Sequence, residues 1–299
     1  MSTQKRNLET ALILLTLSLV TISCSKRLTS EAVVAHPLSS VVEAGTNLVG
    51  GMADDQSSVG LAFSNEKSKP SLWQNLLGEK AYAEVCTRAF LATCDNGVQS
   101  VDYDACTGPL GQLSLTGNVT LTSSNLTCKL ETDGDTVTRT ANLKIQEKKG
   151  AEINISSAQS ADYLGNSYGG GGKITKTSSG WDLEVLGNHR SIVKDGKELL
   201  NISSRTLSSS HVTGSLMRGN RTLTGGQLEV NHNLAKFTAV MEPTDLKWNN
   251  LCCHPISGSM KITLTGAKTG TSVVKFNGCG SASVEENGES KELTLQRCQ

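Results

Sequence analysis

Cysteine is the residue type in this chain with the widest choice of chemistry, because a thiol can form a disulfide, bind a metal or accept a lipid. The nine cysteines are Cys24, Cys86, Cys94, Cys106, Cys128, Cys252, Cys253, Cys279 and Cys298. No two of them have the C-x-x-C spacing that is typical of zinc sites, although "CCHP" at 252–255 adds a histidine to a pair. We therefore expect disulfides, no metal site and no cofactor.

The first residues of the chain predict export. Lys5 and Arg6 precede an uncharged apolar run, residues 11–22, which is followed by the small Ser23 and then Cys24. A positive start, a short apolar run and a small residue are the parts of a secretory signal peptide. The run is shorter than the roughly 20 residues that cross a bilayer as a helix.

A small residue followed by cysteine at the end of such a run resembles the lipobox of bacterial lipoproteins, although Thr21 stands where that family prefers leucine. The resemblance implies that Cys24 carries diacylglycerol, that residues 1–23 are removed, and that the new amino terminus is acylated, for example with palmitate. Ser25 in place of aspartate implies the outer membrane of the cell envelope. The alternatives are plain secretion, with an incidental Cys24, and an uncleaved helix.

Once Cys24 is set aside for the lipid, eight cysteines remain, and an even number in an exported chain is typical of disulfides. They form two clusters, residues 86–128 and 252–298, so we expect two bridges within each cluster. The connectivity stays open. A bridge from Cys252 or Cys253 to Cys279 stabilises the fold by about 3 kcal/mol in the chain-entropy model.

Alternation of apolar and polar residues with a period of two predicts strands with one buried face. It recurs at residues 112–122, 136–145, 152–156, 226–241, 259–266, 272–278 and 291–295. Turn pairs lie between these runs: Asp133-Gly134, Asp195-Gly196, Asn277-Gly278 and Asn287-Gly288. The fold class is therefore all-β, an antiparallel meander of about 10–13 strands that closes into a barrel or a two-layer sandwich so that no edge is exposed.

The chain divides into four parts. Residues 1–23 are the lipoprotein signal peptide, and residues 24–70, which have little apolar patterning, are a flexible tether. Residues 71–84 form one short amino-terminal helix, since Leu72, Trp73, Leu76 and Leu77 recur at helical spacing. Residues 85–299 are a single disulfide-bonded antiparallel β domain.

No catalytic or phosphate-binding motif is complete. "GNSYGGGGKIT" at 165–175 has Ser167 where a Walker sequence needs glycine and Ile174 after its lysine, so we interpret it as a flexible loop. The five histidines show no H-x-x-x-H pair, and no serine lies in G-x-S-x-G. A Ser-His-Asp set can be assembled from so many candidates that its availability carries no weight. Zero net charge without a basic stripe argues against nucleic acid.

Residues 253–284, a cysteine before a P-x-x-G turn, two strands and then Cys-Gly, resemble a carboxy-terminal pattern of uncharacterised exported bacterial proteins. The resemblance implies no activity, but it implies a bridge from Cys252 or Cys253 to Cys279 that joins adjacent strands. We therefore expect a lipid-anchored, non-enzymatic binding or structural module with an envelope protein or polysaccharide as partner. The alternative is an envelope hydrolase acting on wall or surface polymers, which requires a cleft holding a histidine with carboxylates. An assembly factor for an envelope machine is a third candidate.

Overall fold

The computed structural model describes residues 93–107, 113–147, 150–214, 219, 221–249, 252, 254–286 and 288–295. The predicted signal peptide, tether and helix, residues 1–84, lie outside the described residues. The described residues include no helix that is long and apolar enough to cross a membrane.

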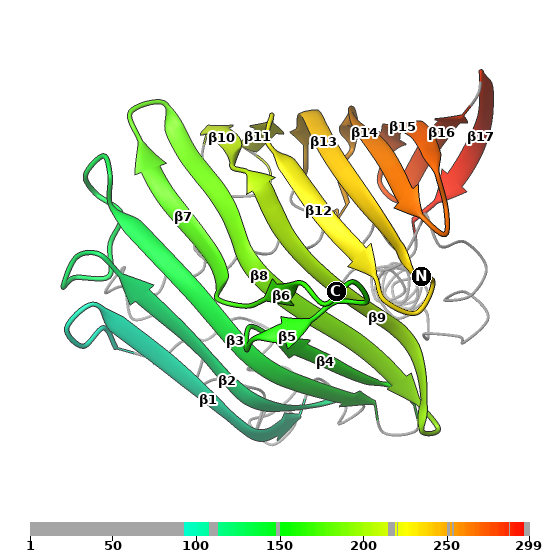
Figure 1. Ribbon diagram of the computed structural model, residues 1–299. Coiled ribbons are helices and arrows are strands. Elements are labelled where there is room, and N and C mark those ends of the chain that lie inside the picture. The colour runs from blue at the N-terminus through cyan, green and yellow to red at the C-terminus, as the bar shows by residue number, and fades with distance from the viewer. Residues whose placement is uncertain are drawn as a thin grey trace, which may run out of the picture.

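The described residues form seventeen strands (Figure 1). They are β1 (Val98–Thr107), β2 (Leu113–Ser123), β3 (Thr136–Glu147), β4 (Glu152–Ser156), β5 (Ser160–Ala161), β6 (Ser167–Tyr168), β7 (Gly171–Thr177), β8 (Gly180–Lys194), β9 (Lys197–Ser208), β10 (Ser210–Gly214), β11 (Arg221–Thr224), β12 (Gln227–His232), β13 (Phe237–Lys247), β14 (Ser257–Gly266), β15 (Gly270–Gly278), β16 (Ser281–Glu286) and β17 (Glu289–Thr294).

Fifteen of these strands pair in one antiparallel sheet, and β5 and β6 form a separate hairpin. The sheet has twelve positions, because three positions are each shared by two shorter strands. Thus β4 and β7 both lie between β3 and β8, β9 and β10 both pair with β8, and β11 and β12 both pair with β13. The predicted all-β antiparallel meander is confirmed.

The sheet differs from the expectation in how it ends. The strand order runs from β1 to β17 without pairing between them, so the described strands form one open sheet where a closed barrel or two stacked sheets were expected. Figure 1 shows the two end strands at opposite sides of a continuous twisted surface. The outermost strand β17 carries alternating charges, Glu289, Lys291 and Glu292, which discourage pairing with another chain.

Pro243 lies inside β13 at the level where its neighbour changes from β12 to β11. The Pro243 carbonyl accepts a hydrogen bond from the Gly225 N–H (3.0 Å). The backbone carbonyl and nitrogen of Pro243 therefore point toward the break between β11 and β12. Proline has no N–H to donate. The missing donor therefore faces the break, and the ladder with β14 on the other side is kept, with Pro243 opposite Met260.

The core lies along one face of the sheet, here called the apolar face. Cross-strand neighbours Val230 and Ala239 are fully buried there, as are Ile262, which pairs with Met241, and Val274. Each buried side chain of the size of Val230, Ile262 or Val274 contributes roughly 1.5–3 kcal/mol. The alternate positions of the same strands form the polar face, which carries Glu229, Asn231 and Thr238, and it is on this face that the β5–β6 hairpin lies.

Two of the predicted turn pairs can be compared with the structure, and one of them is confirmed. Asp195 and Gly196 join β8 to β9 with φ of 51° and 72°, the tight hairpin that the pair predicts. Asn277 and Gly278 were also predicted to be a turn, but Gly278 still pairs with Ser281 at the end of β15. The chain therefore turns at Cys279 and Gly280, and Cys279 is the residue that forms the disulfide with Cys252.

Candidate functional site

Residues 157–170, here called the strap, leave the sheet after β4 and cross its polar face before β7 begins. The base of the strap is closed by the Gly170 N–H, which donates to the Ser157 carbonyl (2.8 Å). A Cβ placed on Gly187 of β8 would lie 2.1 Å from the backbone nitrogen of Gly169. Only glycine at position 187 therefore lets the strap backbone lie directly on the sheet.

Asp162 holds the tip of the strap in shape. One carboxylate oxygen accepts the backbone N–H groups of Leu164 and Asn166 (both 2.8 Å), and the other accepts the Asn166 side-chain amide (3.1 Å). Burial alone raises the pKa of Asp162, but the hydrogen bonds from Asn166 and Leu164 outweigh it and hold that pKa below its usual value. The ionised carboxylate is therefore the form that the folded tip stabilises.

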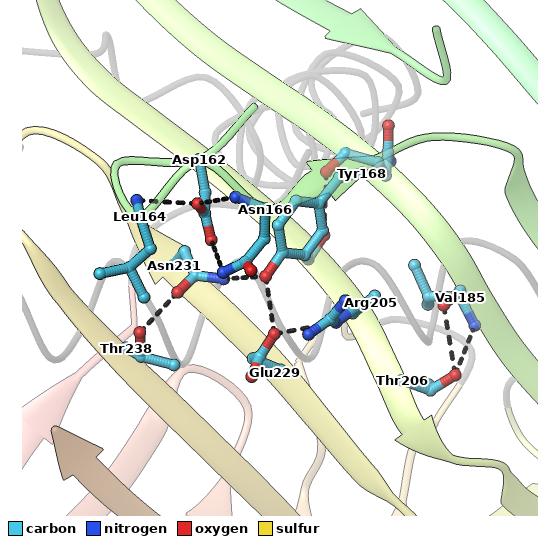
Figure 2. Close-up of polar contacts among 12 residues, drawn as sticks. Asp162, Leu164, Asn166, Tyr168, Val185, Arg205, Thr206, Glu229, Asn231 and Thr238 are labelled. Carbon is cyan, nitrogen blue, oxygen red and sulfur yellow. Dashed lines mark hydrogen bonds and ion pairs between the residues drawn. The ribbon is translucent and has the colours of Figure 1, made fainter. Parts of the chain in front are cut away.

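Tyr168 lies in the arm of the strap that leads from the tip to β7, and it anchors this arm in a buried polar cluster (Figure 2). Its side chain is 1 % exposed, and its hydroxyl donates to a carboxylate oxygen of Glu229 (2.7 Å). The Asn231 amide donates to the same hydroxyl, and the Asn231 carbonyl accepts from Thr238 (2.5 Å). Arg205 donates to the same Glu229 oxygen (3.0 Å), and its guanidinium carbon lies 5.0 Å from the centre of the Tyr168 ring.

The cluster is built for attachment and not for proton transfer. Burial, and then the hydrogen bond to Glu229, raise the pKa of Tyr168 far above its ordinary value. A phenol that is a weaker acid than usual, and whose proton is already donated to a carboxylate, is poorly suited to general acid or base catalysis near neutral pH. The residues instead satisfy one another, as buried polar groups must.

A second polar attachment joins the strap to β9 and to the turn after β12. The Tyr163 backbone N–H donates to the Asn233 side-chain carbonyl, and the Tyr163 hydroxyl is 3.0 Å from that of Thr238. The Asn233 amide in turn donates to Asn201 (2.6 Å) and to Ser203 (3.1 Å). Both arms of the strap are therefore tied to strands that lie far from it in the sequence.

Among the described residues there are two disulfides, Cys94–Cys128 and Cys252–Cys279, with Cα–Cα distances of 5.9 and 5.5 Å. Each lies within one of the two cysteine clusters, so the predicted disulfides are confirmed for these four residues. The bridge to Cys279 also removes the Cys252 thiol as a ligand for a metal site at 252–255.

The remaining cysteines are not tested. Cys24, Cys86, Cys253 and Cys298 lie outside the described residues, as does the side chain of Cys106. Their lipidation and pairing stay predictions. Within the described part of the chain, no three His, Cys, Asp or Glu side chains form a group that could hold a metal ion.

The sequence interpretation of residues 165–175 as a flexible loop was wrong. Ser167 and Tyr168 form β6, and Gly171 to Thr175 belong to β7, which pairs with β3 and β8. The glycines reflect close backbone approach in a sheet, since a Cβ on Gly171 would lie 1.9 Å from the Arg139 carbonyl oxygen. The signal for the buried cluster was present in the lone Tyr168 among these small residues.

Comparisons with known proteins add no identification: no family model, no curated protein and no solved structure matches this chain.

Proposed function

We propose that this is a lipid-anchored cell-envelope protein whose β domain is a binding or structural module, with the strap as its contact element. The anchor is the lipid on Cys24, and Ser25 directs the protein to the outer membrane. Disulfides in both cysteine clusters support an oxidising compartment, as expected after export.

One observation carries the proposed role of the strap. Leu164, at its tip, is 62 % exposed, although Asp162 fixes the backbone on both sides of it. A rigid loop that presents an apolar side chain to solvent binds a partner without the entropic cost of ordering itself. The buried polar cluster beneath it supplies the rigidity. The partner is an envelope protein or a polysaccharide.

Membrane fractionation tests the anchor. The native protein is expected with membranes, and Cys24→Ala is expected to be soluble or to keep residues 1–23. Protease treatment of intact cells then shows whether the domain faces outward. If Cys24→Ala fractionates and is processed like the native protein, Cys24 is not the anchor and its thiol needs another partner.

Site-specific crosslinking in cells tests the strap. A photoreactive residue at Leu164 is compared with the same residue at Leu126, which is also exposed (72 %) but lies outside the strap. One discrete adduct is expected from position 164 and not from position 126, and Asp162→Ala is expected to abolish it. Equal crosslinking from both positions would contradict the role of the strap.

A further inference from the structure

Three polar side chains form a hydrogen-bonded row at one rim of the polar face. His211 of β10 has its Nδ1 2.7 Å from a carboxylate oxygen of Asp182 in β8, and its Nε2 3.3 Å from the hydroxyl oxygen of Ser179. Ser179 is in the two-residue turn between β7 and β8. These are the contacts of a nucleophile, a base and a carboxylate that orients the base.

The carboxylate determines which ring nitrogen carries the proton. An ionised carboxylate only accepts hydrogen bonds, so the Nδ1 of His211 must donate to Asp182. In the neutral ring Nε2 is then an acceptor, and the Ser179 hydroxyl donates to it. This is the tautomer in which imidazole can remove the serine proton.

The sheet itself fixes the geometry. Asp182 and His211 are directly opposite each other in the register of β8 and β10, on the face opposite Trp181 and Val212. A Cβ on Gly180 would lie 2.0 Å from the Val212 carbonyl oxygen and 3.4 Å from the Nε2 of His211. Glycine at this position therefore lets the serine turn approach β10 closely.

The row is accessible to solutes. The side chains of His211 and Asp182 are 29 % and 40 % exposed, and Ser179 lies on the surface of the turn. Figure 1 shows this hairpin end at the upper rim of the sheet, away from the strap. An electrophile can therefore reach the hydroxyl without any rearrangement of the sheet.

We infer that Ser179 is a reactive nucleophile with His211 as its general base and Asp182 as a positioning residue, and that the site hydrolyses activated carboxylic esters. The Ser179 oxygen attacks the ester carbonyl as its proton passes to Nε2. The alkoxide leaves with that proton as an alcohol, and acyl-Ser179 remains. Water then attacks the acyl carbonyl as its proton passes to Nε2, and the bond to the Ser179 oxygen breaks. His211 returns that proton to Ser179, and a carboxylic acid is released. This activity goes beyond the proposed binding role.

A fluorophosphonate probe tests the nucleophile on the purified full-length protein. The serine oxygen displaces fluoride from the phosphorus, and mass spectrometry of the peptides locates the adduct. We expect the adduct on Ser179, its loss in Ser179→Ala, and an unchanged rate in Ser178→Ala, which alters the neighbouring exposed serine of the same turn. Native protein that is not labelled on Ser179, or labelled equally in Ser179→Ala, would overturn the inference.

Asp182→Asn tests the positioning role. The asparagine amide can donate to Nδ1, which favours the opposite tautomer with the proton on Nε2. We expect labelling about 100-fold slower, the size of a typical general-base contribution, together with the corresponding change in the ¹⁵N shifts of His211. Release of p-nitrophenol from p-nitrophenyl acetate should fall in parallel. An unchanged labelling rate with the tautomer switched would show that His211 is not the base.

Discussion

Two serine–histidine pairs on the same sheet have the same spacing and opposite surroundings. At the centre of the polar face the Ser203 hydroxyl is 3.3 Å from His189, and at the rim the Ser179 hydroxyl is 3.3 Å from His211. Ser203 is completely buried and also accepts a hydrogen bond from Asn233 (3.1 Å), whereas Ser179 is exposed. Because Ser203 is buried, its contact with His189 has a structural role and the hydroxyl is not accessible to a substrate.

The second difference is the partner on the far side of the imidazole. The Nδ1 of His211 lies 2.7 Å from the Asp182 carboxylate, which fixes the tautomer of the ring. Burial lowers the pKa of His189, and the Glu198 carboxylate offsets this only in part. The distance between a serine and a histidine therefore says little about reactivity without the burial and the third group.

The largest effect that separates the centre from the rim is expected at Tyr168. Tyr168→Ala should lower the free energy of unfolding by about 3–5 kcal/mol, because a fully buried aromatic ring is lost. Tyr168→Phe should cost about 1–3 kcal/mol, because it leaves Glu229 and Asn231 without a buried partner. Urea unfolding measures both. A Tyr168→Phe protein as stable as the native one would show that the cluster does not hold the strap.

The two serines should respond in opposite ways to the same substitution. Ser203→Ala should destabilise by about 1–3 kcal/mol, since a buried hydrogen-bonding group disappears. Ser179→Ala should change stability by less than about 0.5 kcal/mol, as is usual for an exposed position. The fluorophosphonate reaction should show the reverse order, with Ser203→Ala labelled like the native protein. If the same variant were affected more strongly in both stability and fluorophosphonate labelling, the proposed difference between Ser203 and Ser179 would be contradicted.

The smallest expected effect is the pH dependence of stability from the central histidines. Burial lowers the pKa of both His189 and His232 below the ordinary value of 6.5. The unfolded chain then binds more protons than the folded one as pH falls below about 6.5. The stability that the two neutral histidines contribute is therefore fully present above that pH and declines below it. His232→Gln should lose less stability between pH 7.5 and 5 than the native protein, as thermal unfolding can show.

The sequence predicted the strands best where alternation is unbroken. Residues 152–156 form β4 as expected, and the alternating run 226–241 corresponds to β12, a turn and the first half of β13. Strands β8 and β9 were not predicted, because the pairing of β8 with its neighbours shifts near Gly187 and again after Ile192. Such irregularities move apolar side chains between odd and even positions and break the period of two.

The candidate sites were hidden for a different reason. Asn231 stands at a polar position of an alternating run, and alternation predicts exposure there, but the strap covers it completely. The strap is brought to that position by the fold, over a separation of 63 residues between Tyr168 and Asn231. Ser179, His211 and Asp182 likewise become meaningful only once the register of β8 and β10 places them together.

The most direct test of the central claim, that a buried polar cluster holds the strap rigid, is hydrogen exchange at the backbone N–H groups of Leu164 and Asn166. Both donate to Asp162, and we expect both to be protected in the native protein. Tyr168→Phe should reduce their protection while the amides of β14 and β15 exchange as before. Exchange at the rate of an unprotected peptide in the native protein would contradict the claim.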